Sequence, residues 1–111
     1  MTDIMLPADS DDRKQIPLVR GLLDYFPLAL AEIAKISSAG NQQHNPGEEI
    51  HWARSKSKDH ADCIGRHLID RGTIDTDGQR HTGKLAWRAL ALLQEELEYE
   101  LNMPISRGSR P

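Results

Sequence analysis

The chain has 111 residues and a net charge of −3, which leaves room for one domain and excludes a uniformly basic protein that binds duplex nucleic acid by its overall charge. The single cysteine excludes a disulfide within the chain and fits a reducing compartment. No stretch approaches the roughly 18 apolar residues of a membrane span, so we expect no contact with a membrane. Aromatic residues make up only 5% of the chain, and alanine and leucine supply apolar side chains instead. This composition favours helices over a β-sandwich.

The N-terminal part of the chain predicts a flexible start followed by two short helices. Residues 1–12 are acidic and contain no Lys or Arg, so they lack the basic start of a secretory signal and are expected to be flexible. Pro17 and Pro27 each suit the first turn of a helix, where a missing N–H costs nothing. We therefore predict helices over residues 18–26 and 28–38, and we expect Gly40 to end the second one.

The rest of the chain predicts a loop and two longer helices. Residues 41–58 are polar and irregular, with a turn signal at residues 45–47, and predict one long polar loop. A third helix is expected from the N-cap Ser57 to residue 71, where Gly72 ends it. A fourth helix, over residues 80–101, carries a long face of leucine and alanine.

Together these elements predict an all-α fold, a small antiparallel helical bundle of about four helices with one long polar loop. The helical domain is expected to span residues 13–103, and residues 104–111 are expected to form a flexible C-terminus. A long Leu/Ala face in so small a protein needs a surface to cover it, so we expect a homo-oligomer.

Cationic side chains concentrate at the start of the fourth helix and on the helix before it. His81, Lys84 and Arg88 lie on one face near a helix N-terminus, and Arg66 and His67 lie on the third helix. Such groups, together with free backbone N–H groups, predict a phosphate site. The alternative is a solvated basic face that nearby aspartates balance.

Trp52 lies in the polar loop, where it either stacks on a nucleobase or plugs the bundle. The sequence alone leaves both roles open. All five histidines lie between His44 and His81, interleaved with Arg and Asp. This spread favours the polar lining of one pocket over a zinc site, because zinc usually takes a closely spaced Cys or His pair from one of two segments.

Two carboxylate pairs offer an alternative site for a metal ion. Asp59 and Asp62 on the third helix, and Glu95 and Glu98 on the fourth, are each spaced i, i+3. Facing pairs of this kind hold Mg²⁺ or Mn²⁺ against a polyphosphate. Such pairs are also common on any solvated helix, so we favour no metal cofactor, and these four carboxylates are the expected ligands if Mg²⁺ or Mn²⁺ binds.

Several motifs together resemble a known family. They are residues 40–48, His51-Trp52, residues 62–68 with the Arg66-His67 pair, Asp75-Thr76-Asp77-Gly78 followed by His81, and residues 86–90. From residue 25 to residue 98 this set resembles the N-terminal domain of phage dATP/dGTP diphosphohydrolases, which also occurs alone in phage proteins. The family pattern implies that the candidate functional positions are His44, Trp52, Asp62, Arg66, His67, Asp75, His81 and Arg88.

The resemblance implies a nucleotide-related role in the cytoplasm of an infected bacterial cell. In those enzymes hydrolysis is expected of a separate domain similar to the MazG-type all-α pyrophosphatases, which carry Glu-x-x-Glu and Glu-x-x-Asp on successive helices. This chain has at most the two carboxylate pairs, and we therefore favour a binding module over an enzyme. It would hold or sequester a phosphorylated purine nucleotide, by analogy one made by host immunity, through His44, Trp52, Arg66, His67, His81, Lys84 and Arg88. The alternatives are a Mg²⁺- or Mn²⁺-dependent dATP/dGTP diphosphohydrolase that releases pyrophosphate, and a structural module without a ligand.

Overall fold

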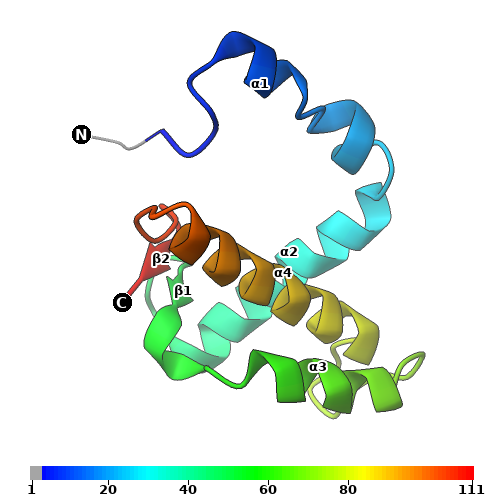
Figure 1. Ribbon diagram of the computed structural model, residues 1–111. Helices are drawn as coiled ribbons and strands as arrows, with labels where there is room; N and C mark the ends of the chain where they lie inside the picture. Colours follow the sequence, from blue (N-terminus) through cyan, green and yellow to red (C-terminus); the bar gives the residue numbers. More distant parts are fainter. Residues whose placement is uncertain (1–3) are drawn as a thin grey trace.

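The computed structural model describes residues 4–111, which fold mainly into helices (Figure 1). In chain order the elements are α1 (Ser10–Lys14), the π-helical turn η1 (Val19–Leu23), α2 (Pro27–His44), β1 (Trp52–Ala53), the 3-10 turn η2 (Arg54–Lys56), α3 (His60–Ile69), α4 (His81–Glu100) and β2 (Ser109–Arg110). The mainly helical fold confirms the helical part of the prediction. The antiparallel order of the bundle and the domain limits stay predictions. In the described part of the chain, no helix is long and apolar enough to cross a membrane.

The N-terminal arm, residues 4–26, differs from the prediction in its helices. Residues 1–3 of the predicted flexible start lie outside the described residues. Farther along, Asp9 caps α1 by accepting a hydrogen bond from the backbone N–H of Asp12 at 3.1 Å. The helix predicted over residues 18–26 is instead the turn η1, and Phe26 leaves the helical conformation. Proline disfavours that conformation in the residue before it, so Pro27 separates η1 from α2.

α2 continues past Gly40, so the predicted end of this helix is wrong. A glycine inside a helix costs only about 0.5–1 kcal/mol relative to alanine, which is too little to end a helix that other contacts hold. The helix ends instead at His44, and the backbone N–H of the C-cap residue Asn45 donates to the carbonyl of Asn41 at 2.7 Å. The Asn41 side chain accepts from the Asn45 amide and from the backbone N–H of His51, and it donates to the carbonyl of Glu48. These bonds hold the turn and shorten the predicted loop.

α3 and α4 follow the prediction to within a few residues at each end. α3 begins after Asp59 rather than after Ser57, and Gly72 adopts the expected left-handed conformation with φ of 85°. α4 packs against both α3 and α2. A Cβ atom added at Gly83 of α4 would collide with the side chain of Ile36 of α2. The missing side chain therefore permits the close approach of these two helices.

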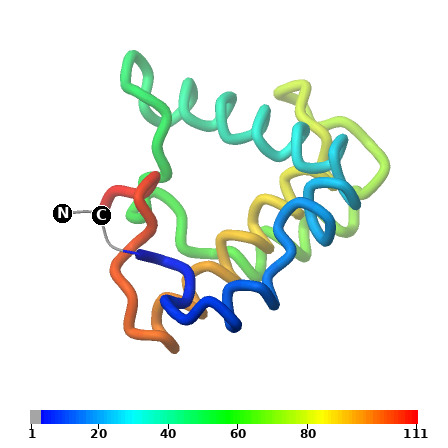
Figure 2. Tube along the Cα trace, turned by 90° about the horizontal axis from the view of Figure 1, so that it is seen from above, coloured from blue at the N-terminus to red at the C-terminus, as the bar shows by residue number. Residues whose placement is uncertain are grey.

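A small parallel sheet corrects the all-α prediction. Trp52 of β1 lies opposite Ser109 of β2, and the backbone N–H of Trp52 donates to the carbonyl of Gly108 at 2.8 Å. Figures 1 and 2 show the C-terminal segment, in red, beside the green segment that contains β1. Residues 104–111, which were expected to be a flexible end, thus contribute a strand that pairs with the middle of the chain.

The arm leaves many apolar side chains uncovered. Figure 1 shows α1 and η1 standing apart from α3. Val19 and Phe26 are 56% and 51% exposed, and Leu93 on the outer face of α4 is 49% exposed. The radius of gyration is 15.3 Å, whereas a compact domain of this length has a radius of about 13 Å. The excess reflects an arm that the rest of the chain does not cover.

Candidate functional site

A cavity of about 830 Å³ lies between the C-terminal half of α2, the segment that contains β1, and the facing sides of α3 and α4. Five of the seven residues predicted to bind a ligand line this cavity, namely His44, Trp52, His67, Lys84 and Arg88. His81 lies beside His67 but does not line the cavity. The structure thus brings a lysine, an arginine, two histidines and a tryptophan from four elements to one cavity.

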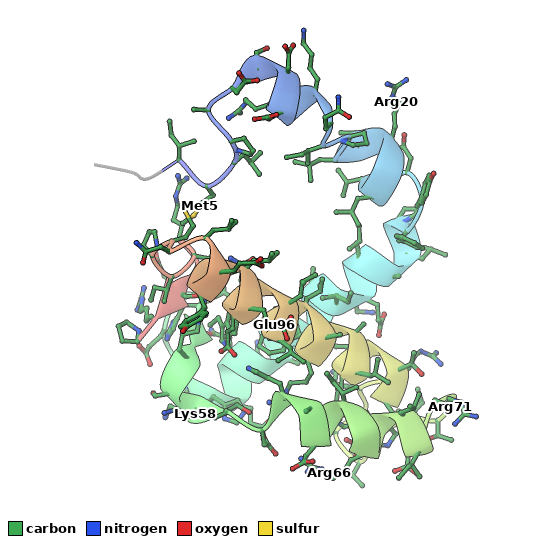
Figure 3. The ribbon with its side chains drawn as sticks, in the orientation of Figure 1. Met5, Arg20, Lys58, Arg66, Arg71 and Glu96 are labelled. Carbon is green, nitrogen blue, oxygen red and sulfur yellow. The ribbon has the colours of Figure 1, made fainter. Side chains whose placement is uncertain are left out.

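Arg66 lies outside this cavity. Its guanidinium donates to Asp59 at 2.9 Å, and its side chain is 62% exposed. Figure 3 shows Arg66 on the outer side of α3, pointing away from α4. Arg66 and Asp59 are spaced i, i+7 and share the outer face, whereas the next residue, His67, faces inward. Their hydrogen bond holds the pKa of Asp59 below its ordinary value.

Lys84 is the cation at one end of the cavity, and two loop carboxylates hold it. Its ammonium donates to Asp75 Oδ2 at 2.7 Å and to Asp77 Oδ2 at 2.6 Å. Burial lowers the pKa of Lys84, but these two hydrogen bonds outweigh burial and leave the pKa above its ordinary value. The hydrogen bond from Lys84 in turn lowers the pKa of Asp75 to about 2. All three groups are therefore charged at neutral pH.

Arg88 is positioned by the buried His60. Its guanidinium donates to His60 Nδ1 at 3.2 Å and lies 3.5 Å from an oxygen of Asp59. Arginine only donates, so Nδ1 of His60 is an acceptor and Nε2 carries the hydrogen. This Nε2 lies 3.3 Å from Glu95 but makes no hydrogen bond of good geometry within the described residues. His60 therefore supports Arg88 from behind the cavity wall.

Trp52 and Trp87 form the aromatic part of the cavity wall. The two rings meet edge to face at 5.6 Å, and Trp87 Nε1 donates to Ser37 at 2.7 Å. The guanidinium of Arg54 lies 3.6 Å above the ring of Trp52, so that face of the indole is covered. Sequence reasoning did not assign Trp87 a role, although its i, i+3 spacing from Lys84 places both on one face of α4.

The four carboxylates expected to hold Mg²⁺ or Mn²⁺ do not fit a shared metal ion. Both oxygens of Glu98 accept from the guanidinium of Arg54, at 2.9 and 2.7 Å, and Glu98 also binds Gln94 and the backbone of Ser106. Burial raises the pKa of Glu98, but the hydrogen bonds from Arg54 and Gln94 outweigh burial and lower it. Within residues 4–111, Asp59, Asp62, Glu95 and Glu98 form no group of three or more whose ligand atoms converge.

His67 and His81 meet at the Lys84 end of the cavity. Their Nδ1 atoms are 2.8 Å apart, which is a hydrogen bond in which one ring donates to the other. Burial lowers the pKa of His67, and the proximity of His81 and of the Lys84 ammonium lowers it further. His67 is therefore a neutral imidazole at neutral pH and not a fixed cation.

The fold and the cavity together define a small helical domain whose hollow is lined by lysine, arginine, histidine and tryptophan. A model of the dATP/dGTP diphosphohydrolase N-terminal domain family matches residues 7–104 of the chain. The chain therefore belongs to this family, which confirms the resemblance seen in the sequence. No curated protein and no solved structure matches the chain.

Proposed function

We propose that this domain binds a phosphorylated purine nucleotide in the cavity and holds it without cleaving it. The observation that carries the proposal is a hollow of about 830 Å³ in which two indoles and several cationic or imidazole side chains meet. Pockets for small ligands span about 300–1,000 Å³ and combine apolar walls with a few polar groups. The family description names two purine nucleotides, which favours a purine base.

The phosphate groups are assigned to the side of the cavity formed by α4. Lys84, Arg88 and Lys56 line the cavity, and His67 adds a neutral donor or acceptor. The Lys84 side chain is only 21% exposed, and its ammonium is shared by Asp75 and Asp77. A phosphate that reaches Lys84 replaces part of this pairing with a charge-assisted hydrogen bond of similar strength.

The base is assigned to the aromatic wall. Arg54 covers one face of Trp52, and Trp52 and Trp87 together form the part of the cavity wall that a base would contact. Stacking of a base on an aromatic side chain contributes about 1–3 kcal/mol. We therefore expect Trp52 to combine both roles considered from the sequence, because it packs against Arg54 and also lines the cavity.

A nucleotide screen with matched variants tests this proposal. The intact chain is mixed with dATP, dGTP, their monophosphates and pyrimidine controls, with and without Mg²⁺ or Mn²⁺, and the melting temperature and the binding heat are measured. A ligand that binds the native state raises the melting temperature. We expect Lys84→Met and Arg88→Ala each to weaken purine nucleotide binding at least tenfold, whereas Arg66→Ala, which removes the same charge outside the cavity, leaves it unchanged.

The same experiment separates the alternatives. Binding of no nucleotide by the wild-type chain rejects the proposal and favours a structural module. Release of pyrophosphate from dGTP with Mn²⁺ that is abolished by Asp62→Ala favours hydrolysis. We expect binding without pyrophosphate release, since Glu98 is engaged by Arg54 and the carboxylates do not converge.

The exposed leucines of α4 support a second proposal, that the chain forms a homo-oligomer. Leu90, Leu93 and Leu97 are 48%, 49% and 41% exposed, and the arm adds further uncovered apolar side chains. A second copy packed on this face removes that surface from water. Light scattering on a size-exclusion column measures the mass, and we expect Leu93→Glu to shift it to that of one chain. A wild-type chain that elutes as a monomer contradicts this proposal.

A further inference from the structure

Three potential metal ligands converge at the Lys84 end of the cavity. They are His67 of α3, Asp75 of the following loop and His81, the first residue of α4. Among the described residues they form a group whose ligand atoms all lie within 4.8 Å of one another. The two Nδ1 atoms are 2.8 Å apart, and His81 Nδ1 lies 3.9 Å from Asp75 Oδ2. Two imidazole nitrogens bound to one ion at about 2.0–2.1 Å lie roughly 3.0–3.4 Å apart, so the two rings need only a small shift, and the Asp75 carboxylate must move closer to them.

The backbone holds these ligands in place before any ion binds. Asp75 donates its N–H to the carbonyl of Gln79 at 2.7 Å, and Gly78 donates back to the carbonyl of Asp75 at 2.9 Å. Gly78 has a φ of 83°, a conformation that glycine adopts without strain. His81 then donates its N–H to the carbonyl of Thr73 at 3.2 Å. Because the loop is closed by these bonds, little chain entropy is lost when its ligands are used.

We propose that His67 Nδ1, His81 Nδ1 and a carboxylate oxygen of Asp75 bind a divalent transition metal ion of the Zn²⁺ or Co²⁺ type. Two imidazoles and one carboxylate suit such ions, whereas Mg²⁺ and Ca²⁺ prefer sites made of oxygen atoms alone. The ion takes the place of the hydrogen that the two rings share, and that hydrogen moves to Nε2 of the donating ring. The site differs from the four carboxylates considered in the sequence and does not depend on the proposed nucleotide function.

The positive charge of Lys84 is expected to change the affinities for a metal ion and for a phosphate in opposite directions. Its ammonium lies 2.7 Å from the Asp75 oxygen that is nearest to His81. A metal ion must share this carboxylate with a positive charge, so Lys84 weakens metal binding. The same positive charge attracts a phosphate in the cavity. Removal of the charge is therefore expected to strengthen the binding of metal and to weaken the binding of nucleotide.

A titration of the intact, tag-free chain with Co²⁺ alone tests the site, because the bound ion is followed by its visible absorption. Competition against a coloured chelator measures the affinity for Zn²⁺. We expect one equivalent to bind, with at least tenfold weaker binding in His67→Ala and in His81→Ala. His51→Ala is the matched control, since His51 lines the cavity but lies outside the cluster, and it should bind as the wild type does. We expect Lys84→Met to bind the ion more tightly.

Two results overturn the proposal: wild-type affinity in the double variant His67→Ala, His81→Ala, or no saturable Co²⁺ binding by the wild-type chain. The second result means that the two rings share a hydrogen bond only. If the alanine variants lose their helical circular dichroism, the ring-nitrogen resonances of the wild-type chain with Zn²⁺ decide instead. Both Nδ1 resonances of His67 and His81 must move, and unmoved resonances reject the site. Nucleotide affinity measured in the presence of a metal chelator tests the proposed function separately from the metal site.

Discussion

Two clusters of charged groups lie next to the cavity, one behind Trp52 and one beside His67, and they use charge differently. At the Trp52 end, the Arg54 and Glu98 side chains are only 12% and 9% exposed and are joined by two hydrogen bonds. At the His67 end, Lys84 binds Asp75 and Asp77, whose side chains are 24% and 42% exposed. A buried pair that loses one partner leaves an uncompensated charge, whereas water or a ligand replaces the partner of a more exposed pair. The first end therefore holds the fold together, and the second is free to exchange partners.

The largest expected effect comes from removing the cation at the Trp52 end. Arg54→Ala leaves Glu98 buried without its main partner and also removes the contacts of Arg54 with Trp52 and Ser109. We expect the free energy of unfolding to fall by about 3 kcal/mol. Urea unfolding followed by circular dichroism measures this loss.

Arg66→Ala is the matched control for that experiment, because it removes the same charge from an exposed pair with Asp59. Its expected cost is at most about 1 kcal/mol. If the two variants are equally stable, the Arg54–Glu98 pair does not hold the fold.

Two glycines inside helices test how closely α2 and α4 pack beside Lys84. Gly83 lies against Ile36, and a methyl group there requires the Ile36 side chain to move from its packed position, whereas Gly65 of α3 has open space beside it. We expect Gly83→Ala to destabilise the fold by about 1–2 kcal/mol and Gly65→Ala to stabilise it by about 0.5–1 kcal/mol. Thermal unfolding of both variants checks the opposite signs, and a stabilised Gly83→Ala contradicts the close approach.

Acid unfolding compares the two ends through their carboxylates. The pKa of Glu98 lies below its ordinary value because the bonds from Arg54 and Gln94 outweigh burial. Its contribution to stability is therefore fully present above the pKa of the unfolded chain and is lost as the pH falls through the lower, folded pKa. We expect Glu98→Gln to flatten the loss of stability between about pH 5 and pH 3. An unchanged pH profile in this variant shows that another carboxylate dominates.

The smallest expected change in stability is that of Lys84→Met, which removes the cation at the His67 end. The ammonium pairs with loop carboxylates that water can also solvate, so the free energy of unfolding is expected to change by less than about 1 kcal/mol. The variant should keep its urea midpoint while nucleotide affinity falls. A loss as large as that of Arg54→Ala erases the distinction between the two ends.

Local signals predicted much of the helical framework. The third and fourth helices follow from apolar spacing, and the left-handed Gly72 just after the third helix follows from its residue type, since both signals depend on residues a few positions apart. Gly40 shows the limit of such signals, because Asn41 holds the end of α2 by bonds that composition does not reveal. The motifs around Arg66-His67 and His81 were sufficient to predict the family, which the family match confirms.

The candidate site was predicted in part. His67, Lys84 and Arg88 line the cavity as a group, whereas Arg66, the neighbour of His67, lies on the outer face. Two adjacent residues on a helix differ by about 100° in direction, and the sequence does not say which of them a packed neighbour will cover. The choice between them is made by the packing of α3 on α4.

Helical periodicity and short motifs are local properties of the chain, and they are sufficient to predict a small helical domain of a nucleotide-related family. Which distant groups meet depends on how the helices pack. Arg54 and Glu98 are 44 residues apart, and β1 pairs with a strand at the C-terminus. His67 reaches His81 only because the loop between them is folded back by its own hydrogen bonds. No local sequence pattern predicts these contacts between residues that are distant in the sequence.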